Sequence, residues 1–386
     1  MRVAIVHYWL LAERGGEKVL QAIANLYPQA DLFFCVADTD IANRLFPGRR
    51  VHTSLVQRLP FSKRLYQFYL PLMPLALEQF DLQGYDLVIS SESGPAKGVI
   101  VPPDALHVCY CHSPMRYLWD HYHHYMDDAG SLARFAMAPM FHRLRQWDVT
   151  SAARVDAFAA NSRFVRKRIR KYYRRDADVV HPPVDLNQFA LRQRTPGSAF
   201  ADAYLWVGQL TAYKRPELAL QACRELGRRI VVIGTGEQEA RLQSIGADAV
   251  FLGRVDGDQL AEAYANARAL IFPGEEDFGI TPVEAMASGL PVIAYGKGGA
   301  LDTVADGESG VLFDTQSVDG VCRAIRRFED LEARLDRRRI ADGARTFDHE
   351  NFNRSFLQFV AHAQQRQKNN ETAPLAAQAI CRHSDR

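Results

Sequence analysis

Short apolar runs alternate with helix-length amphipathic segments along most of the chain. In the first half, these runs predict strands at Val3–His7, Leu32–Val36, Leu87–Ser90, His107–Cys111, Ala157–Ala160 and Val179–His181. In the second half, they predict strands at Tyr204–Val207, Ile230–Ile233, Val250–Leu252, Ala269–Phe272, Val292–Ala294 and Val311–Phe313. Strands that are apolar throughout are typical of parallel sheets covered on both faces. The pattern therefore predicts an α/β fold made of βαβ units.

A polar segment separates the two halves. Residues 186–203 show little hydrophobic periodicity and contain Pro196-Gly197, which indicates an interdomain linker. We expect two doubly wound parallel-sheet domains, at residues 1–185 and 204–345, and a length of 386 residues suits two domains. Such sheets bind ligands beyond the carboxyl ends of their strands, so the predicted site is a cleft that both domains face.

The C-terminal region predicts one more helix. Phe352, Phe356 and Phe359 recur at helical spacing, so residues 346–368 are expected to form an amphipathic helix that needs a partner surface. Residues 369–386 have little periodicity and are expected to form a flexible tail.

The composition is that of an ordinary globular protein. A total of 47 basic against 45 acidic side chains gives a formal net charge of +2, which argues against nucleic acid as a partner. Six cysteines without framework spacing favour a reducing compartment. The segment MRVAIVHYWLL runs directly into Glu13 and Arg14, unlike a secretory signal, and no apolar run reaches the roughly 18 residues that span a bilayer. We therefore expect a cytoplasmic protein that can approach a membrane from one side.

The first candidate binding motif is Gly15-Gly16, between the first predicted strand and a helix. Glycines at such a turn let backbone amides approach a phosphate, and the helix N-terminus adds a partial positive charge. The alternative is a glycine turn that only the topology requires. The motif alone does not decide between the two.

The densest motif is EEDFGITPVE, which spans the end of one strand and the start of a helix. Glu276 lies in the loop and Glu284 lies one to two turns into the helix, so both carboxylates reach the carboxyl end of the sheet. Carboxylates accept strong hydrogen bonds from paired sugar hydroxyls. The amides of Phe278, Gly279 and Ile280 open the helix and suit an anion or a hydroxyl. A solvated acidic loop before a structural glutamate explains this spacing less well.

Two further motifs follow strands of the second half. Lys214 and Arg215 come just after its first strand, where a lysine can neutralise a diphosphate leaving group, although a surface helix start is the simpler alternative. Gly234 and Gly236 begin an incomplete GxGxxG with glutamate in the sixth place, which makes dinucleotide binding a weak interpretation.

His112 stands where a predicted strand ends, a usual place for a functional histidine, although a structural histidine is more common. Cys109 and Cys111 share one strand face while His112 points away, which argues against a shared metal site. Asp38 and Asp40 form a DxD pair, for which capping of the next helix is the stronger interpretation. No metal site is predicted.

Two segments have the composition of membrane-contacting surfaces. Residues 162–175 form a helix with many basic residues and no acidic one, which suits an anionic leaflet. Residues 59–77 are rich in aromatic and aliphatic side chains. For residues 162–175 the alternative is a solvated basic helix face. For residues 59–77 it is ordinary core packing.

Taken together, the motifs resemble retaining glycosyltransferase family 4. The resemblance rests on the first GG turn and on CHSPMRYLW, AANS, HPPVD, VGQLTAYKRPELA, FLGRV and EEDFGITPVEAMASGLPVIAYGKGGALDTV, and it covers residues 1 to about 365. It implies the GT-B fold, with two Rossmann-like domains facing a central cleft. The bacterial mannosyltransferase-like branch, which acts in lipopolysaccharide and capsule assembly, is the most similar one.

The resemblance implies a role for each motif residue. The catalytic set would be His112 beside the transferred sugar, Lys214 on the diphosphate and Glu276 on the sugar hydroxyls. The donor-binding set would be Gly15, Gly16, Gln209, Arg215, Gly253, Arg254, Val255, Phe278, Gly279, Ile280 and Glu284. Within it, Glu284 would bind the ribose, and Gly253 to Val255 would line the base pocket. The terminal helix would return to the first domain. The sequence departs from the family pattern at Gln209, where an arginine is usual, so the phosphate clamp is reduced to Lys214 with help from Arg215.

The implied reaction is a metal-independent, retaining transfer of a hexose. GDP-mannose is the first guess for the donor, and a polyprenyl-diphosphate-linked glycan at the inner membrane face is the implied acceptor; no cofactor is expected. A UDP-sugar-dependent transferase and a non-catalytic sugar-nucleotide binding protein are the alternatives. A nicotinamide-dependent dehydrogenase is a third, which the incomplete GxGxxG disfavours.

Overall fold

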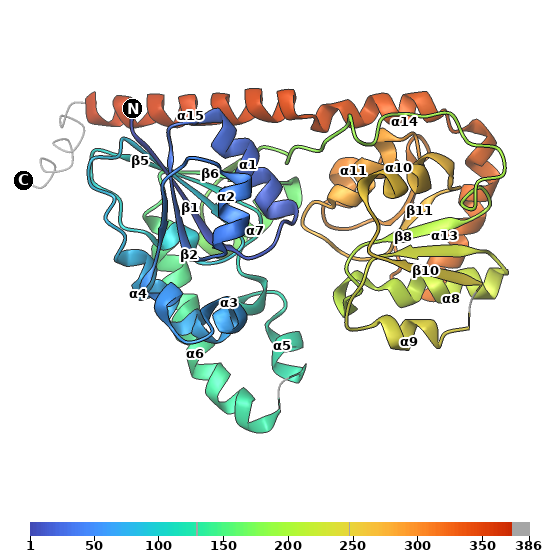
Figure 1. Ribbon diagram of the computed structural model, residues 1–386, viewed down its shortest axis with the longest axis horizontal. Helices are drawn as coiled ribbons and strands as arrows, with labels where there is room; N and C mark the ends of the chain where they lie inside the picture. Colours follow the sequence, from blue (N-terminus) through green and yellow to red (C-terminus); the bar gives the residue numbers. More distant parts are fainter. Residues whose placement is uncertain (129, 247, 373–386) are drawn as a thin grey trace, which may run out of the picture. The chain divides into compact units, whose positions relative to one another are not determined.

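The computed structural model describes residues 1–128, 130–246 and 248–372, and the chain divides into two compact units (Figure 1). Among the described residues, the first unit comprises 1–160, 168–178 and 353–372, and the second comprises 161–167 and 179–352. Each unit contains its own parallel sheet, which confirms the prediction of two doubly wound α/β domains. The sequence-based boundaries at residues 185 and 204 remain predictions.

The first sheet has seven strands in the order β3-β2-β1-β4-β5-β6-β7. They are β1 (Val3–Leu10), β2 (Asp31–Ala37), β3 (Val51–Thr53), β4 (Leu87–Glu92), β5 (Leu106–Cys111), β6 (Ala157–Ala160) and β7 (Ala177–Val179). β1 pairs in parallel with β2 on one side and with β4 on the other. The chain therefore reverses its winding direction between β1 and β4, and the carboxyl ends of these two strands form the usual ligand-binding position of such a sheet.

Alternation along β1 divides its side chains between the two faces of the sheet. Val6 and Tyr8 pack in the hydrophobic cluster that includes Met73, whereas Ile5 and His7 point to the opposite face. The helices of this unit include α1 (Gly15–Leu26), α2 (Thr39–Leu45), α3 (Ser62–Leu65), α4 (Met73–Glu78), α5 (Tyr122–Asp128), α6 (Ser131–Ala153) and α7 (Arg163–Tyr173), the last of which extends into the second unit. Short 3₁₀ helices lie at Leu55–Arg58, Tyr66–Leu72, Ala96–Gly98 and Arg116–Leu118.

Four strands of the first sheet differ from the sequence prediction by two residues or more, and one of them, β4, runs two residues past its predicted end, to Glu92. β1 continues past His7 because Trp9 and Leu10 still pair with β2. The last strand lies two residues earlier than predicted, at Ala177–Val179. β3 was not predicted, because it is a three-residue edge strand with two exposed side chains.

The second sheet has six strands in the order β10-β9-β8-β11-β12-β13. They are β8 (Tyr204–Val207), β9 (Ile230–Ile233), β10 (Ala249–Gly253), β11 (Leu270–Phe272), β12 (Val292–Tyr295) and β13 (Gly310–Phe313). All six were predicted, with ends that differ by at most one residue. The helices are α8 (Pro216–Leu226), α9 (Glu239–Gln243), α10 (Gly257–Asn266), α11 (Ile280–Ala287), α12 (Ala300–Thr303), α13 (Val318–Leu331) and α14 (Arg337–Ala344), with 3₁₀ helices at Ala212–Lys214, Glu332–Arg334 and Arg345–Phe347.

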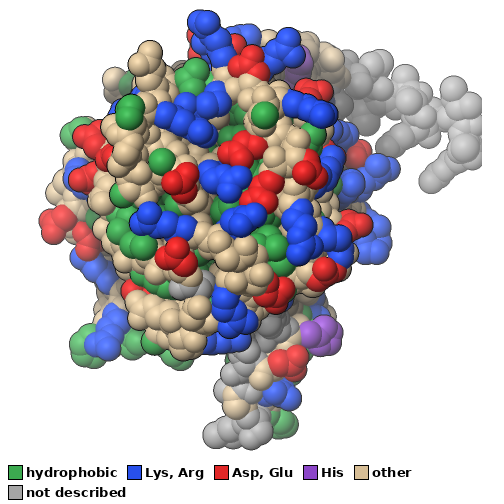
Figure 2. Space-filling model, turned by 90° about the vertical axis from the view of Figure 1, so that its right-hand side faces the viewer, with side chains coloured by type: hydrophobic (Ala, Val, Ile, Leu, Met, Phe, Trp, Pro, Cys, Tyr) green, Lys and Arg blue, Asp and Glu red, His purple; other side chains and the backbone are tan. Residues whose placement is uncertain are grey.

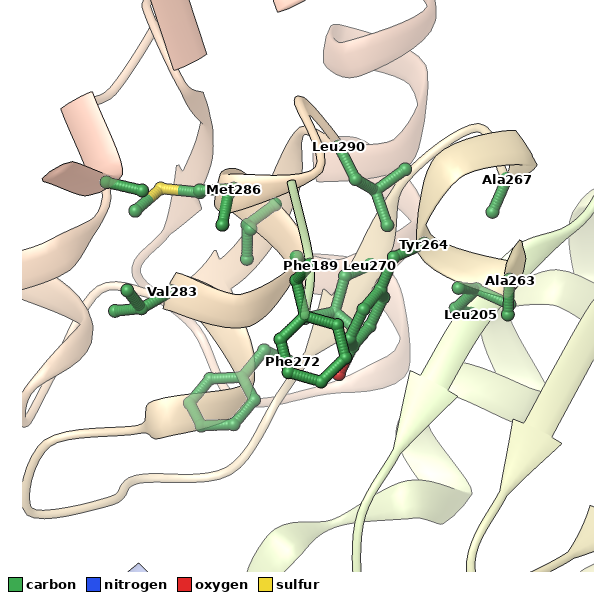
Figure 3. Close-up of a cluster of buried hydrophobic side chains, with 14 of the residues drawn as sticks. Phe189, Leu205, Ala263, Tyr264, Ala267, Leu270, Phe272, Val283, Met286 and Leu290 are labelled. Carbon is green, nitrogen blue, oxygen red and sulfur yellow. The ribbon is translucent and has the colours of Figure 1, made fainter. Parts of the chain in front are cut away.

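Helices cover both faces of the second sheet. Leu205 of β8 belongs to the hydrophobic cluster on the side of α10, α11 and α14, and Trp206 belongs to the cluster on the side of α8 and α13. Figure 3 shows the first of these clusters, in which Leu270 and Phe272 of β11 lie near Tyr264 and Phe189. This packing fixes α11 over the carboxyl end of β11, where the EEDFGITPVE motif lies.

The C-terminal helix α15 runs from His349 to Thr372, four residues beyond the predicted end. Within the first unit, the ring of Phe356 lies 6.2 Å from that of Tyr110 in β5, and Phe359 is also buried. Residues 373–386, most of the predicted tail, lie outside the described residues. None of the described helices is long and apolar enough to cross a bilayer.

Candidate functional site

In the first unit, the glycine turn and His112 lie together at the carboxyl edge of the sheet. His112 directly follows β5, and its backbone N–H donates to the carbonyl of Glu92 at the end of β4, at 2.7 Å. A β-carbon added to Gly16 would lie 3.3 Å from the Tyr8 hydroxyl and 4.0 Å from Nε2 of His112. Two motifs from distant parts of the sequence therefore meet at one place, with Gly15 at the first position of the α1 helix beside them.

Three residues that form a chain of contacts leading to His112 were not predicted as part of the site. Ser91 Oγ lies 2.9 Å from His112 Nε2, and His7 Nδ1 lies 3.2 Å from the same hydroxyl. His7 Nε2 faces Glu17 Oε1 at 4.0 Å. Glu17 is only 4% exposed, and its other oxygen accepts the Arg14 backbone N–H at 3.0 Å, which caps α1. The GGE sequence was a signal for this arrangement, because Glu17 stands at the third helical position, where a capping carboxylate belongs.

A buried ionic cluster also supports the strand end that carries His112. Lys97 is fully buried and pairs with Asp148 and with Glu92, whose Oε1 lies 3.3 Å from Lys97 Nζ. Trp119 Nε1 donates to Asp148 at 2.8 Å, and the Tyr173 hydroxyl donates to it at 3.1 Å. Burial raises the pKa of Glu92 to about 7, although the Lys97 ammonium opposes the shift. No sequence pattern indicated this cluster, because its members come from separate elements.

In the second unit, Lys214 and Glu276 form an ion pair. Lys214 Nζ lies 2.8 Å from Glu276 Oε1, and their side chains are 16% and 19% exposed. A β-carbon added to Gly208, directly after β8, would lie 3.3 Å from the same Nζ. The loop after β8 and the loop after β11 therefore bring the two predicted catalytic side chains of this unit into direct contact, still reachable by solvent.

Close backbone packing fixes the loop that carries Glu276. The Gly299 N–H donates to the Glu276 carbonyl at 2.8 Å, and a β-carbon on Gly299 would lie only 2.2 Å from Phe278 Cα. A β-carbon on Gly298 would lie 2.3 Å from the Glu276 carbonyl oxygen. The last two glycines of the GKGG sequence after β12 are therefore required by this close approach. Its contribution to holding the glutamate loop was not predicted.

The first turn of α11 lies directly after this loop. Gly279, at φ +84°, is the N-cap, so the amides of the predicted donor-binding residues Phe278, Gly279 and Ile280 stand at a helix N-terminus. Glu284 is nearly buried and accepts a hydrogen bond from the Tyr264 hydroxyl at 3.3 Å. Burial, with the Glu284 carboxylate, raises the pKa of Tyr264 well above its usual value, so this hydroxyl remains a donor.

The predicted base-pocket residues lie at the end of β10. Gly253 has φ +63°, and its carbonyl accepts the Gly234 N–H at 2.7 Å. Val255 packs against the hydrophobic cluster of Figure 3, while Arg254 is exposed. A β-carbon on Gly234 would lie 1.8 Å from the Gly208 carbonyl oxygen, so close packing of two loops explains the incomplete GxGxxG.

Gln209 and Arg215 lie on either side of Lys214 in the chain. Gln209 is exposed, and its carbonyl accepts the Thr211 N–H at 2.8 Å. Arg215 adopts the left-handed conformation, and its Nε lies 2.6 Å from Glu217 Oε1. The Arg215 guanidinium is thus held by its own helix, whereas the Lys214 ammonium is held by the glutamate loop.

The DxD pair has the structural role that its position suggested. Asp38 is the N-cap of α2 and accepts the backbone N–H groups of Asp40 and Ile41, at 3.0 and 3.2 Å. Across the described ranges, no three His, Cys, Asp or Glu side chains are grouped as a metal site would require.

Two family models match the chain. The model described as Glycosyltransferase Family 4 matches residues 13–188, and the model described as Glycosyl transferases group 1 matches residues 201–347. The range 201–347 contains Lys214, Glu276 and Glu284. The range 13–188 contains Gly15, Gly16 and His112, together with Glu17 and Ser91.

Curated relatives match over part of their length. A GDP-mannose-dependent alpha-mannosyltransferase of Mycolicibacterium smegmatis is 44% identical over 117 residues, 30% of each chain. A D-inositol 3-phosphate glycosyltransferase of Nocardioides sp. is 32% identical over 225 residues, 49% of each chain. The chain thus spans half or less of the length of these relatives.

Solved structures match over nearly the whole chain. An Anabaena protein, HepE, in complex with UDP and glucose aligns with a TM-score of 0.65 at 16% identity, covering 94% of this chain and 99% of that one. The lipopolysaccharide outer core galactosyltransferase WaaB aligns with the same TM-score, identity and coverage. At this identity the likeness establishes the shared fold.

Proposed function

The chain belongs to glycosyltransferase family 4 and has the GT-B fold, and from this premise we propose that it is a retaining hexosyltransferase that uses a nucleotide sugar. The observation that carries the proposal is the contact between Lys214 and Glu276 beside the N-terminus of α11. An ammonium group, backbone amides at a helix N-terminus and a carboxylate are the groups that a diphosphate and a hydroxylated sugar need.

The chemistry requires charge stabilisation more than a strong nucleophile. A nucleoside diphosphate is already a good leaving group, so orientation and a positive potential supply most of the acceleration. Lys214 would neutralise the departing diphosphate, while Glu276 and the amides of Phe278 to Ile280 would hold the sugar hydroxyls. The departing phosphate oxygen would accept the acceptor's proton, as retention by front-face transfer requires. Glu276 is assigned no nucleophilic role.

Mannose from GDP-mannose is the proposed donor group. The name of the mycolicibacterial relative supports this choice, although the aligned segment covers 30% of that protein. A UDP-sugar is the alternative, which the UDP and glucose bound by the fold relative HepE favour. Gly253, Arg254 and Val255 are the proposed lining of the base pocket, and Glu284 the proposed ribose ligand, with Tyr264 fixing its carboxylate.

A lipid-linked glycan at the inner membrane face is the proposed acceptor. The segment 59–77 carries Phe61, Phe68 and Leu75 at 75%, 79% and 53% exposure, so three large apolar side chains of this segment are available for contact with a membrane. The exposed basic residues Lys63 and Arg64 on the same segment suit an anionic leaflet. By contrast, the face of the second unit in Figure 2 mixes basic and acidic side chains.

A donor panel tests the proposed reaction. The full chain is incubated with GDP-mannose, UDP-glucose, UDP-galactose and ADP-glucose and a polyprenyl-diphosphate-linked acceptor in lipid, and nucleoside diphosphate release is measured with and without EDTA. We expect release with GDP-mannose, undiminished by EDTA, and an anomeric configuration retained in the product. Turnover with UDP-sugars alone supports the alternative donor. Binding without turnover, together with an unchanged cellular glycan in a Glu276→Ala strain, supports a non-catalytic protein.

Vesicle sedimentation tests the membrane contact. We expect the chain to sediment with vesicles that contain anionic phospholipid, and a Phe61→Ser/Phe68→Ser variant to remain in the supernatant. A Leu191→Ser variant is the matched control, because Leu191 is an exposed apolar residue of the second unit. Equal sedimentation of the double variant and the control would contradict the assigned surface.

A further inference from the structure

A chain of buried polar groups leads from the N-terminus of α1 to His112. Its members are Glu17 on α1, His7 on β1 and Ser91 on β4, and each is 4% exposed or less. Register brings the last two together, because His7 and Ser91 are direct partners in the β1–β4 pairing. These strands flank the point where the sheet reverses its winding, which is the usual ligand-binding position of this fold.

The surroundings of His7 decide where its protons lie. Nδ1 is 2.9 Å from the Ser91 carbonyl oxygen, which can only accept, so Nδ1 carries a hydrogen and donates it. The opposite nitrogen, Nε2, faces the Glu17 carboxylate at 4.0 Å. His7 is thus held from both sides, with its Nδ1–H pointing toward Ser91.

Glu17 links this histidine to the glycine turn. One of its oxygens faces His7, and the other accepts the Arg14 N–H that closes the capping box of α1. Burial would raise the pKa of Glu17, but its proximity to His7 and the backbone N–H groups that it accepts outweigh this effect and hold the pKa below its usual value. The carboxylate therefore stays ionised while it fixes both the His7 ring and the turn at Gly15 and Gly16.

The Ser91 hydroxyl can accept a hydrogen bond from His7 and donate one to His112. This hydroxyl lies 3.2 Å from the His7 Nδ1–H group and 2.9 Å from His112 Nε2. A hydroxyl has one hydrogen, and an oxygen that accepts from His7 can direct this hydrogen to His112. His112 Nε2 then accepts, which selects the neutral tautomer with its hydrogen on Nδ1.

We propose that His7 and Ser91 are positioning residues that fix the ring orientation and tautomer of His112. Glu17 connects them to the glycine turn at Gly15 and Gly16, because it contacts His7 and also caps the helix that begins at this turn. The proposal rests on the proposed transferase function, in which His112 lies beside the transferred sugar. A ring held by a buried hydroxyl meets its substrate without reorganisation, and misplacement of such a group by about 1 Å can lower turnover roughly a hundredfold.

The same strand offers a matched control. Ser90 is the neighbour of Ser91, is equally buried, and its hydroxyl lies 3.0 Å from Nε2 of another buried histidine, His107. Burial lowers the pKa of His107 to about 3, so that ring is neutral. Ser90→Ala and Ser91→Ala each remove one buried serine–histidine hydrogen bond from β4, but only the second affects His112.

Steady-state kinetics with the full chain form the first arm of the test. We expect Ser91→Ala to lower kcat between about tenfold and a hundredfold with an unchanged KM for the donor. Ser90→Ala is expected to keep kcat within about twofold of the wild-type value. It should lower the melting temperature as much as Ser91→Ala does. His7→Asn, whose amide can replace the Nδ1 donor, is expected to retain more activity than His7→Leu. Equal kcat in the two serine variants would overturn the proposal.

Nuclear magnetic resonance of the imidazole nitrogens forms the second arm and needs no turnover. In ¹⁵N-histidine-labelled protein, with His112 assigned by a His112→Gln variant, we expect an unprotonated Nε2 and a protonated Nδ1. Ser91→Ala is expected to mix the tautomers, and Ser90→Ala to leave them unchanged. If the donor panel yields no turnover, the proposed function fails while this arm still decides the positioning. A His112 spectrum that Ser91→Ala does not alter would refute it.

Discussion

Lys214 Nζ and Glu276 Oε1 lie 2.8 Å apart, so the proposed diphosphate ligand and the proposed sugar ligand are in direct contact. Opposite charges at this distance hold each other in place before a donor arrives. A donor phosphate would compete with Glu276 for the ammonium, and a sugar hydroxyl would compete with Lys214 for the carboxylate. In the proposed function, the pair would thus be positioned in advance for both halves of a sugar diphosphate.

Removing the ammonium should damage catalysis far more than stability. We expect Lys214→Met to lower kcat/KM by roughly 10²- to 10³-fold, because a positive charge on the leaving group is lost. Both side chains are partly exposed, so the free energy of unfolding should change by less than about 1 kcal/mol. Arg215→Met is the control, because its guanidinium pairs with Glu217. Steady-state kinetics and urea denaturation measure the two effects. If Arg215→Met lowered kcat/KM as much as Lys214→Met does, both side chains would bind the diphosphate, which would contradict the role assigned to Lys214 alone.

The glycines after β12 should be as important as the glutamate that they hold. We expect Gly298→Ala to weaken donor binding at least tenfold, because its β-carbon would displace the Glu276 carbonyl, from which it would be only 2.3 Å away. Gly307→Ala separates this effect from backbone strain, since Gly307 also has positive φ, at +81°, but meets no atom within 4 Å. The control should lose only about 1 kcal/mol of stability. Calorimetric titration with the donor nucleotide measures both variants, and equal binding would contradict this mechanism.

The fold was largely predictable because its signal is local. Buried strands such as β8 and β9 are continuous runs of aromatic and aliphatic residues, and their predicted ends were correct. β3 was missed because an edge strand of three residues, Val51 to Thr53, has no such run. The contact between Lys214 and Glu276 follows from the rule that carboxyl ends of parallel strands share one edge. The contact between His7 and Ser91 could not be predicted, because it depends on the register of β1 with β4.

The glycine turn should tolerate alanine structurally but not functionally. Gly16 is the second residue of α1, where alanine is the better helix former, and its β-carbon would be 3.3 Å from the Tyr8 hydroxyl. We expect Gly16→Ala to leave the melting temperature within a few degrees of wild type but to lower kcat/KM at least tenfold, because the methyl group narrows the space beside His112. Gly343→Ala, in helix α14 with nothing within 4 Å, should leave activity unchanged. Unimpaired activity of Gly16→Ala would favour a purely topological turn.

The buried cluster around Lys97 should make stability depend on pH. The folded-state pKa of Glu92, about 7, lies above the ordinary value of 4.5, so the folded protein binds more protons than the unfolded chain between these values. The contribution of Glu92 to stability is therefore fully present below about pH 4.5 and is lost as pH rises through 7. Urea denaturation of wild type and Glu92→Gln across pH 5 to 8 isolates this contribution, because the amide cannot titrate. We expect the difference in unfolding free energy to shift in favour of Glu92→Gln as pH rises.

The same cluster gives a stronger test through its cation. Lys97 has no exposed surface and contacts both Glu92 and Asp148, so Lys97→Met would leave two buried carboxylates without their counter-ion. We expect a loss of about 3–5 kcal/mol in unfolding free energy at pH 8. The loss should shrink at pH 5, where Glu92 takes up a proton. Because the Glu92 carbonyl also accepts the His112 N–H, activity should fall with stability. A loss that is equal at both pH values would contradict the elevated pKa of Glu92.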